Sequence, residues 1–261
     1  MSTQSLKIND IEIQIKIEGN GPHVTLIHGV GARLESWNSV VELLKENFTI
    51  VRYDLRGHGA TTKPKGPYSI ALFSEDLAAL LKHLGIGRTH LVGFSLGGLI
   101  AQCFALEHPN TVNRLVILSA VANKTKNEME ILRKRADALM KSVNTPDLKA
   151  ALERCFTPEF RQTHPELVNE RIRLSQQNDP DAFAAAYRAF IEGDFGNKLT
   201  EILHPTLVMT GECDPGSNIR MAQFMHNAIP NSELCIIPNL RHNILVEGPN
   251  IVAGQLQSFL D

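Results

Sequence analysis

Residues 89–102 read Thr-His-Leu-Val-Gly-Phe-Ser-Leu-Gly-Gly-Leu-Ile-Ala-Gln, and this stretch decides how the rest of the chain is interpreted. Its first four residues form a short, mostly apolar run typical of a buried strand, and residues 96–102 have the pattern of a helix. Between them stands Ser95, with a glycine two residues before it and another two residues after it. A sharp strand-to-helix turn leaves no room for larger Cβ substituents at those two positions. The pattern therefore predicts such a turn with Ser95 at its tip.

The predicted turn gives Ser95 the surroundings of a nucleophile. Its hydroxyl group would stand at the carboxyl edge of a sheet, and the N–H of Leu96 would begin a helix, where partial positive charge stabilises an oxyanion. The pattern Gly-x-Ser-x-Gly also arises by chance in loops. The strand before it and the helix after it favour the functional interpretation.

The remaining sequence alternates strands and helices. Residues 6–17 alternate apolar and polar side chains around Asn9-Asp10, which predicts an antiparallel hairpin. Further strands are expected within residues 24–28, 48–53, 90–93, 112–118, 204–210 and 233–237, and helices within 39–46, 70–84, 96–108, 219–228 and 249–260. This repetition predicts an α/β fold with a mostly parallel, doubly wound sheet and helices on both faces.

Residues 123–198 interrupt the alternation with a purely helical pattern. Helices are expected within residues 128–141, 146–156, 166–177 and 181–192, with helix starts at Thr145-Pro146 and Pro180-Asp181. We expect this segment to be a helical lid, inserted into an α/β core made of residues 1–122 and 199–261. Ligands of such sheets bind at the carboxyl ends of the strands, so catalytic residues belong in the loops that follow strands.

Two such loops supply the partners that a serine nucleophile needs. A serine hydroxyl is weak near neutral pH and requires a base and a group that orients the base. Asp214 follows one predicted strand and His242 follows the next. Asp214 also fits a simple turn residue, and Glu212 stands close to it. The chain order Ser95, Asp214, His242 on three strand-end loops favours a Ser-His-Asp triad.

Two glycine-rich loops carry further histidines. His28 begins His-Gly-Val-Gly-Ala, and His58 lies in Arg-Gly-His-Gly. For both histidines we favour a structural role, in which the ring hydrogen-bonds to the loop backbone, over a catalytic one. We expect the N–H of Val30, in the first loop, to pair with that of Leu96 as a two-donor oxyanion hole.

Composition excludes several classes of function. The chain has 261 residues, 43% hydrophobic and 21% charged, with a net charge of −2, which is typical of a globular protein. It has no basic and aromatic cluster typical of nucleic-acid binding, no secretory signal pattern, and no run near the roughly 18 apolar residues of a membrane span. We expect no nucleic-acid or membrane partner and a cytoplasmic location. We expect no metal and no cofactor. The four cysteines are scattered along the chain and are expected to be buried apolar residues: Cys103, Cys155, Cys213 and Cys235.

Together these motifs resemble the α/β-hydrolase superfamily. The resemblance rests on His28-Gly29, residues 53–59 (Tyr-Asp-Leu-Arg-Gly-His-Gly), the turn around Ser95, and the late Asp214 and His242. A serine at the turn differs from the aspartate of the haloalkane dehalogenase and epoxide hydrolase branches. The Gly-Pro-Tyr-Ser-Ile segment and the Gly-Phe-Ser-Leu-Gly-Gly run are most similar to the 3-oxoadipate enol-lactonase group. This resemblance implies hydrolysis of a small ester or lactone.

A carboxylate on such a substrate would require a cation. Arg33, just past the first glycine-rich loop, is the first candidate, and the helical segment offers Arg133, Lys134 and Arg188. For each of them a solvated surface position is the alternative.

Three functions remain open from the sequence. The first is hydrolysis of a small ester or lactone through an acyl-enzyme on Ser95. The second keeps the triad but cleaves a carbon–carbon bond of a ring-cleavage diketone, and it is less favoured because the oxyanion loops of those hydrolases are richer in glycine. The third is a ligand receptor or interaction protein on the same fold. The sequence leaves the substrate and the oligomeric state open.

Overall fold

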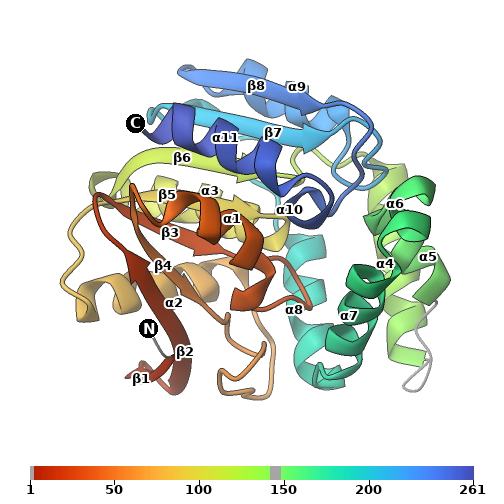
Figure 1. The fold of residues 1–261 in the computed structure, drawn as a ribbon. Helices are drawn as coiled ribbons and strands as arrows, with labels where there is room; N and C mark the ends of the chain where they lie inside the picture. Colours follow the sequence, from red (N-terminus) through yellow and green to blue (C-terminus); the bar gives the residue numbers. More distant parts are fainter. Residues whose placement is uncertain (1–2, 142–147) are drawn as a thin grey trace.

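The computed structural model describes residues 3–141 and 148–261 and contains an eight-stranded sheet (Figure 1). The strands are β1 (Gln4–Ile8), β2 (Ile11–Gly19), β3 (His23–Ile27), β4 (Thr49–Tyr53), β5 (Thr89–Phe94), β6 (Val112–Leu118), β7 (Thr206–Gly211) and β8 (Ser232–Ile237). Their order is β1-β2-β4-β3-β5-β6-β7-β8, and only the pairs made by β2 with β1 and β4 are antiparallel. The predicted parallel sheet with an N-terminal hairpin is confirmed.

The burial of the strands follows from their sequences. In β2 the apolar Ile11, Ile13 and Ile15 are buried, while the polar residues between them reach solvent. This alternation is expected for a strand that exposes one face to solvent. All six residues of β5 are buried, because a continuous apolar run is stable where helices cover both faces. The central strands are therefore the part of the sheet that supports the loops around Ser95.

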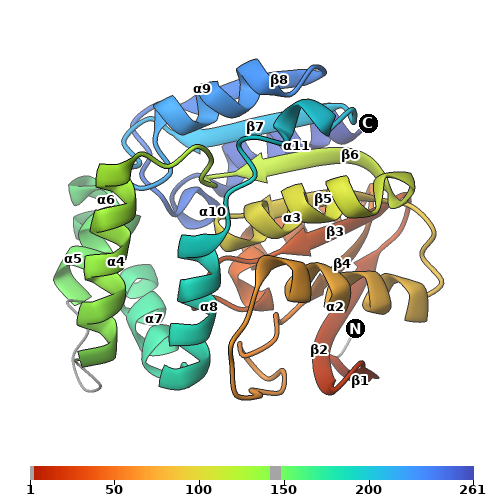
Figure 2. The ribbon, with the colours of Figure 1, turned by 180° about the vertical axis from the view of Figure 1, so that it is seen from behind.

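Helices cover both faces of the sheet. Figure 1 has α1 (Asn38–Leu44) and α11 (Pro249–Leu260) in front, and the view from behind in Figure 2 has α2 (Ile70–His83), α3 (Leu96–Glu107) and α9 (Ile219–Ala228) in front. Each layer has its own apolar core. Val41 and Leu256 belong to the first, and Leu77, Leu99 and Met221 belong to the second. Burial of these two cores fixes the sheet from both sides.

Five further helices of the described ranges lie between β6 and β7 in the chain, beyond the carboxyl ends of the parallel strands (Figure 1). They are α4 (Lys126–Lys141), α5 (Leu148–Cys155), α6 (Pro158–Thr163), α7 (Pro165–Gln176) and α8 (Pro180–Glu192). We call residues 123–198 the helical insertion. The carboxylate of Asp194 joins its two ends, because it accepts the N–H groups of Asn123, Lys124 and Gly196, each at 2.9 Å.

Most observed element ends lie within two residues of the predicted ones, and β6, α9 and α11 match the prediction. The strand expected from residue 204 begins at Thr206, because Pro205 has no N–H to donate to a neighbouring strand. Two helices were not predicted, α6 and α10 (Ile244–Glu247), since such short helices show no periodicity. The predicted helix start at Thr145-Pro146 lies outside the described residues.

The expectation that all four cysteines are buried is wrong for Cys213. Its side chain is exposed in the turn after β7, where the adjacent Asp214 is the residue that turns inward. Cys103 is buried, Cys155 and Cys235 are half-buried, and all four are free thiols. None of the helices in the described ranges is long and apolar enough to cross a membrane.

Candidate active site

Ser95 lies at the tip of the turn between β5 and α3, with φ 55° and ψ −113°, a combination that residues other than glycine rarely adopt. Its N–H donates to the carbonyl of Leu118 at 2.8 Å, and its own carbonyl accepts the N–H of Gly98 at 2.9 Å. A Cβ on Gly93 would collide with the backbone of Gly97, and one on Gly97 would collide with the end of β3. The two glycines thus allow the turn that the sequence predicts.

Asp214, His242 and Ser95 form a hydrogen-bonded row. Nδ1 of His242 donates to Oδ2 of Asp214 at 2.7 Å, and Nε2 of His242 lies 3.2 Å from Oγ of Ser95. The three side chains follow β7, β8 and β5, so strand ends at one edge of the sheet bring together residues as far as 147 positions apart. The bond to Asp214 fixes the tautomer that leaves Nε2 free to accept the serine proton.

Asp214 is buried but keeps a low pKa. Burial by itself would raise the pKa of this carboxyl group, yet the charge and hydrogen bond of His242, together with two backbone N–H groups of the following turn, lower it below its ordinary value. The ionised carboxylate is therefore suited to stabilising a charged imidazole. Glu212 is exposed and accepts the N–H of Asn239 at 3.0 Å instead.

The loop after β3 passes directly beside Ser95. A Cβ built on Gly29 would lie 3.1 Å from the Cβ of Ser95, so the next residue, Val30, presents its backbone close to the serine. Leu96 is the first residue of α3, and its N–H precedes the first hydrogen bonds within that helix. Within the described part of the chain, neither the N–H of Val30 nor that of Leu96 donates to a protein acceptor. Both remain available to a ligand oxygen.

Two buried histidines fix the loops beneath the site. Nδ1 of His28 donates to the carbonyl of Gly29 at 2.8 Å, and its Nε2 accepts the N–H of Leu55 at 3.0 Å. His58 lies 5.1 Å from His28 between ring centres and donates to the carbonyl of Arg56 at 3.0 Å. Burial lowers the pKa of His28 to about 4 and that of His58 to about 3, so both rings are neutral.

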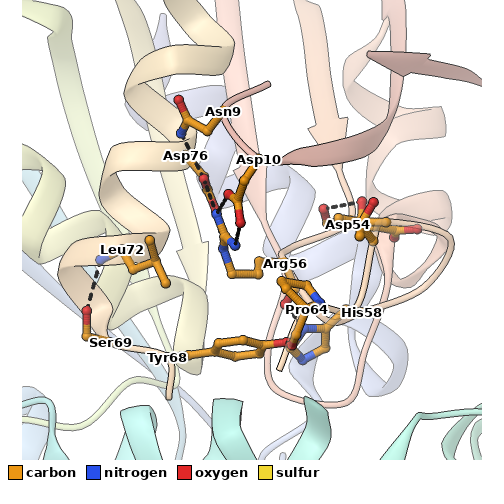
Figure 3. Close-up of polar contacts among 12 residues, drawn as sticks. Asn9, Asp10, Asp54, Arg56, His58, Pro64, Tyr68, Ser69, Leu72 and Asp76 are labelled. Carbon is orange, nitrogen blue, oxygen red and sulfur yellow. Dashed lines mark hydrogen bonds and ion pairs between the residues drawn. The ribbon is translucent and has the colours of Figure 1, made fainter. Parts of the chain in front are cut away.

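Ion pairs hold the loop that follows β4, as Figure 3 shows. The guanidinium of Arg56 donates to both oxygens of Asp76, at 2.8 and 2.9 Å, and to both oxygens of Asp10, at 2.7 and 3.1 Å. Asp54, at the end of β4, accepts the N–H of Leu34 at 2.8 Å and so ties this loop to the segment after Val30. The hairpin, α2 and the loops beside Ser95 are thereby one connected scaffold.

Of the cations predicted to hold a substrate carboxylate, Arg33 contacts the insertion from the core, and the other three lie on the insertion itself. The guanidinium of Arg33 donates to Oε1 of Gln177 at 3.2 Å and to the carbonyl of Leu174 at 3.5 Å, both near the end of α7. The other three are exposed: Arg133, Lys134 and Arg188. Their part in substrate binding stays a prediction.

The sequence patterns did not single out four other arginines of the insertion, which are half-buried: Arg135, Arg154, Arg161 and Arg171. One signal was present for the first of these. Arg135 follows Leu132 by three positions and precedes Ala136, and both of those residues are buried, so it lies on the inner side of α4.

Residues 22–249 match the family described as alpha/beta hydrolase fold. The chain belongs to this family and is a hydrolytic enzyme.

Its relatives include enol-lactonases, as the motifs implied. The "3-oxoadipate enol-lactonase 2" of Acinetobacter baylyi is 29% identical over 235 residues, covering 89% of this chain and 87% of the relative. The "(E)-2-((N-methylformamido)methylene)succinate hydrolase" of the same species is 28% identical, covering 94% of this chain and 92% of the relative. The solved structure of the enol-lactonase from Burkholderia xenovorans has a TM-score of 0.91 and 25% identity, and the match covers 98% of this chain and 99% of that one.

Proposed function

We propose that this protein is a serine hydrolase that cleaves a small ester or lactone through an acyl-enzyme on Ser95. The observation that carries the proposal is the row in which Asp214 bonds His242 at 2.7 Å and His242 lies 3.2 Å from Ser95. The names of the two curated relatives, which describe an enol-lactonase and a hydrolase of a substituted succinate, support a small-molecule substrate.

In the first half of the reaction, Oγ of Ser95 attacks the carbonyl carbon while Nε2 of His242 takes the hydroxyl proton. Asp214 keeps its bond to Nδ1 and stabilises the charged imidazole. The oxygen of the tetrahedral intermediate accepts the N–H groups of Val30 and Leu96. Loss of one such donor typically costs about 3 kcal/mol of transition-state stabilisation.

In the second half, the imidazolium of His242 gives its proton to the leaving oxygen as the bond to the carbonyl carbon breaks. With a lactone, the leaving oxygen stays attached to the acyl group as a new hydroxyl. His242 then takes a proton from water, whose oxygen attacks the acyl-enzyme, and finally returns that proton to Oγ of Ser95. The products are the free acid and the regenerated serine.

We extend the proposal to the helical insertion, which acts as a lid on a core made of residues 1–122 and 199–261. Two contacts support this role. The carbonyl of Cys155, at the end of α5, accepts the N–H of Asn243 at 3.0 Å, and the side chain of Asn178 donates to the carbonyl of Gly31 at 3.0 Å. The insertion thus contacts the loop that carries His242 and the loop that carries Val30. A cover at this place would exclude water from the reacting carbonyl.

The test is the hydrolysis of short p-nitrophenyl esters and small lactones by the purified protein and by Ser95→Ala. We expect Ser95→Ala to lower kcat by at least about a thousandfold, because the nucleophile is gone, with an unchanged far-UV circular dichroism spectrum. Ser39→Ala, at an exposed position on α1, serves as the matched control and keeps full activity. Ester turnover retained by Ser95→Ala contradicts the proposal.

The same screen addresses the other two functions. A coloured ring-cleavage dienoate is added, and its turnover in place of esters and lactones would favour carbon–carbon bond cleavage. The loop His28-Gly29-Val30-Gly31 has fewer glycines than the oxyanion loops of carbon–carbon bond hydrolases, so it gives no support to that reaction. The receptor function is not carried forward, because the relatives that define this chain as a hydrolase cover nearly its whole length.

A further inference from the structure

The four half-buried arginines of the insertion come from four different helices, with Arg135 on α4, Arg154 on α5, Arg161 on α6 and Arg171 on α7. The ion pairs formed by basic residues of the insertion, within the ranges that the structure describes, use other cations: Lys124, Lys134 and Arg173. The insertion thus carries four half-buried guanidinium groups that no acidic side chain of the described residues neutralises at ion-pair distance.

Arg171 has unmet hydrogen-bonding capacity close to the proposed active site. Its Nη1 is buried and has no hydrogen-bond partner among the described residues, which is also true of Nε of Arg161. A buried N–H of a charged group that lacks an acceptor is costly, so such a group is normally retained for a partner. The positive charge of Arg171 acts on His28, beneath the Val30 loop, and on Cys155, at the end of α5. Arg171 is therefore close to the loop of Val30 and to the end of α5, which both border the proposed active site.

Arg154 lies where the insertion touches the histidine loop. Its backbone carbonyl accepts the N–H of His242 at 3.4 Å, and the carbonyl of the next residue, Cys155, accepts that of Asn243 at 3.0 Å. The end of α5 is thereby fixed against the residue that would act as the base. The side chain of Arg154 starts from this fixed point.

Arg135 reaches the same region from α4. It hydrogen-bonds to Tyr187, whose ring stacks on Phe183 with 6.1 Å between ring centres, and Phe183 in turn covers Gly31 beside Val30. Burial and the neighbouring charge of Arg154 lower the pKa of Arg135 below its ordinary value, while the carboxylate of Asp214 acts in the opposite direction. Arg135 therefore lies within electrostatic range of both Arg154 and Asp214.

Like charges held together in a partly buried space repel one another unless an anion joins them. The planar guanidinium matches a carboxylate, which accepts two parallel N–H bonds. We propose that Arg135, Arg154 and Arg171 form a carboxylate-binding subsite, so that the preferred ester or lactone carries an ionised carboxylate away from the reacting carbonyl. This inference rests on the proposed hydrolase function and adds a substrate class to it.

The kinetic test compares two esters of similar size, the neutral 4-nitrophenyl valerate and the anionic mono-4-nitrophenyl glutarate. We expect the native protein to have the higher kcat/KM for the glutarate ester. Arg171→Gln and Arg154→Gln should each lower the ratio of the two kcat/KM values by about tenfold or more, mainly through KM, as expected for the loss of a charge-assisted hydrogen bond. Arg33→Gln in the same assay measures the alternative anchor.

The matched control is Arg173→Gln, which removes a cation two residues away on α7 that is exposed and paired with Glu170. It should leave the ratio unchanged. An equal loss for both esters in Arg171→Gln and Arg154→Gln, or a loss of the same size in Arg173→Gln, overturns the subsite. A loss confined to Arg33→Gln overturns it in favour of Arg33.

A binding measurement separates this inference from the hydrolase function. Glutarate is titrated calorimetrically into the Ser95→Ala protein, which needs no turnover. We expect binding that weakens about tenfold or more on adding Arg171→Gln and is unchanged on adding Arg173→Gln. Absence of glutarate binding in a protein that hydrolyses the neutral ester overturns the subsite alone. Absence of ester hydrolysis by the native protein overturns the proposed function, whatever the titration gives.

Discussion

Ser95 is held in a backbone conformation that costs on the order of 1–3 kcal/mol. Its φ of 55° persists because its N–H and carbonyl are both bonded, to Leu118 and Gly98 respectively, between a buried strand and a buried helix. Relaxing φ to an ordinary value would turn Oγ away from Nε2 of His242. The stability of the sheet thus maintains the position of one hydroxyl group.

The glycines of this turn make the first prediction. Gly93→Ala should lower the free energy of unfolding by about 3 kcal/mol and reduce activity, because the new Cβ meets backbone atoms of Gly97 that cannot yield. Gly254→Ala, on the exposed side of α11 with no atom within 4 Å of the added Cβ, should raise stability by about 0.5–1 kcal/mol. Urea unfolding measures both, and a Gly93→Ala protein as stable as the native one contradicts the argument.

The buried His28 predicts how stability depends on pH. Nε2 of the neutral ring accepts a hydrogen bond from the N–H of Leu55. Protonation of Nε2 would turn it into a donor and break this hydrogen bond. The folded ring titrates at about 4 and the unfolded one at about 6.5, so between these values the unfolded state binds more protons. The stabilisation provided by the neutral ring of His28 is fully present above about pH 6.5, and the free energy of unfolding falls as the pH decreases toward 4. This histidine accounts for about 3 kcal/mol of that loss.

The measurement is urea unfolding at several pH values from about 4.5 to 7.5. His28→Asn should make the dependence between pH 4.5 and 6.5 less steep, with the buried His58 still contributing to the slope, whereas His83→Gln, at an exposed position at the end of α2, should leave it unchanged. The same slope in the native protein and in His28→Asn would show that other groups cause the loss.

At the scale of elements, Arg56 couples the β1–β2 turn, the loop after β4 and α2 (Figure 3). Its two carboxylate partners differ in burial, since the side chain of Asp76 is 3% exposed and that of Asp10 is 64% exposed. The two ion pairs therefore share one guanidinium but differ in how far solvent screens them.

This difference gives a matched pair of variants. Asp76→Ala should lower the free energy of unfolding by about 3–5 kcal/mol, because it removes the buried partner of a buried cation. Asp10→Ala should cost less than about 1 kcal/mol, as solvent screens the exposed pair. Urea unfolding at pH 7 compares them. Equal losses would mean that burial does not decide the strength of these pairs.

The elements that the sequence predicted best are those whose signal is local. β6 is mostly apolar, with the unbroken run Leu115–Leu118 at its end, and α11 begins at Pro249 and keeps a helical period to its end, so the ends of both were predictable. Helix α7 begins one residue earlier than expected, at Pro165, and α8 begins at Pro180, within the predicted start Pro180-Asp181, because proline fits the first helical position without loss of a hydrogen bond. Helix α10 was missed because its four residues are too few to show a helical period.

At the scale of the whole molecule, Glu247 fastens the insertion to the core. Its Oε1 accepts the N–H and the hydroxyl of Thr157, at 2.6 and 2.9 Å, and its Oε2 accepts the N–H of Arg241 at 2.8 Å. Thr157 is the N-cap residue that precedes α6, and Arg241 precedes His242. One carboxylate thus couples the position of the insertion to that of the proposed base.

The last prediction concerns this contact. Glu247→Ala should lower kcat/KM for a short ester by about tenfold and speed trypsin cleavage within α5–α7, because three hydrogen bonds to a charged group are lost. Glu170→Ala, which removes an exposed pair with Arg173, is the control and should change neither quantity. Faster proteolysis with unaltered kcat/KM would show that the contact holds the insertion without positioning His242.

The candidate site was predictable only where single loops carry it. Ser95, Asp214 and His242 each follow a strand in a recognisable local pattern, so the topology of a parallel sheet was enough to expect them together. The inner arginines belong to separate helices, and their convergence depends on how α4, α5 and α7 pack. No spacing along the chain encodes that packing, which is why the sequence pointed to the exposed Arg133 instead.

The chain order of the catalytic row has a consequence for synthesis. Ser95 is translated 147 residues before His242, so at roughly 5–20 residues per second a growing chain carries its serine for roughly 7–30 s before the histidine exists. Helix α11, which packs on α1 across the first core, follows later still. Under the proposed mechanism, a ribosome-bound fragment that contains Ser95 but not yet His242 lacks its base, so it should not hydrolyse an ester until the far edge of the sheet has been made.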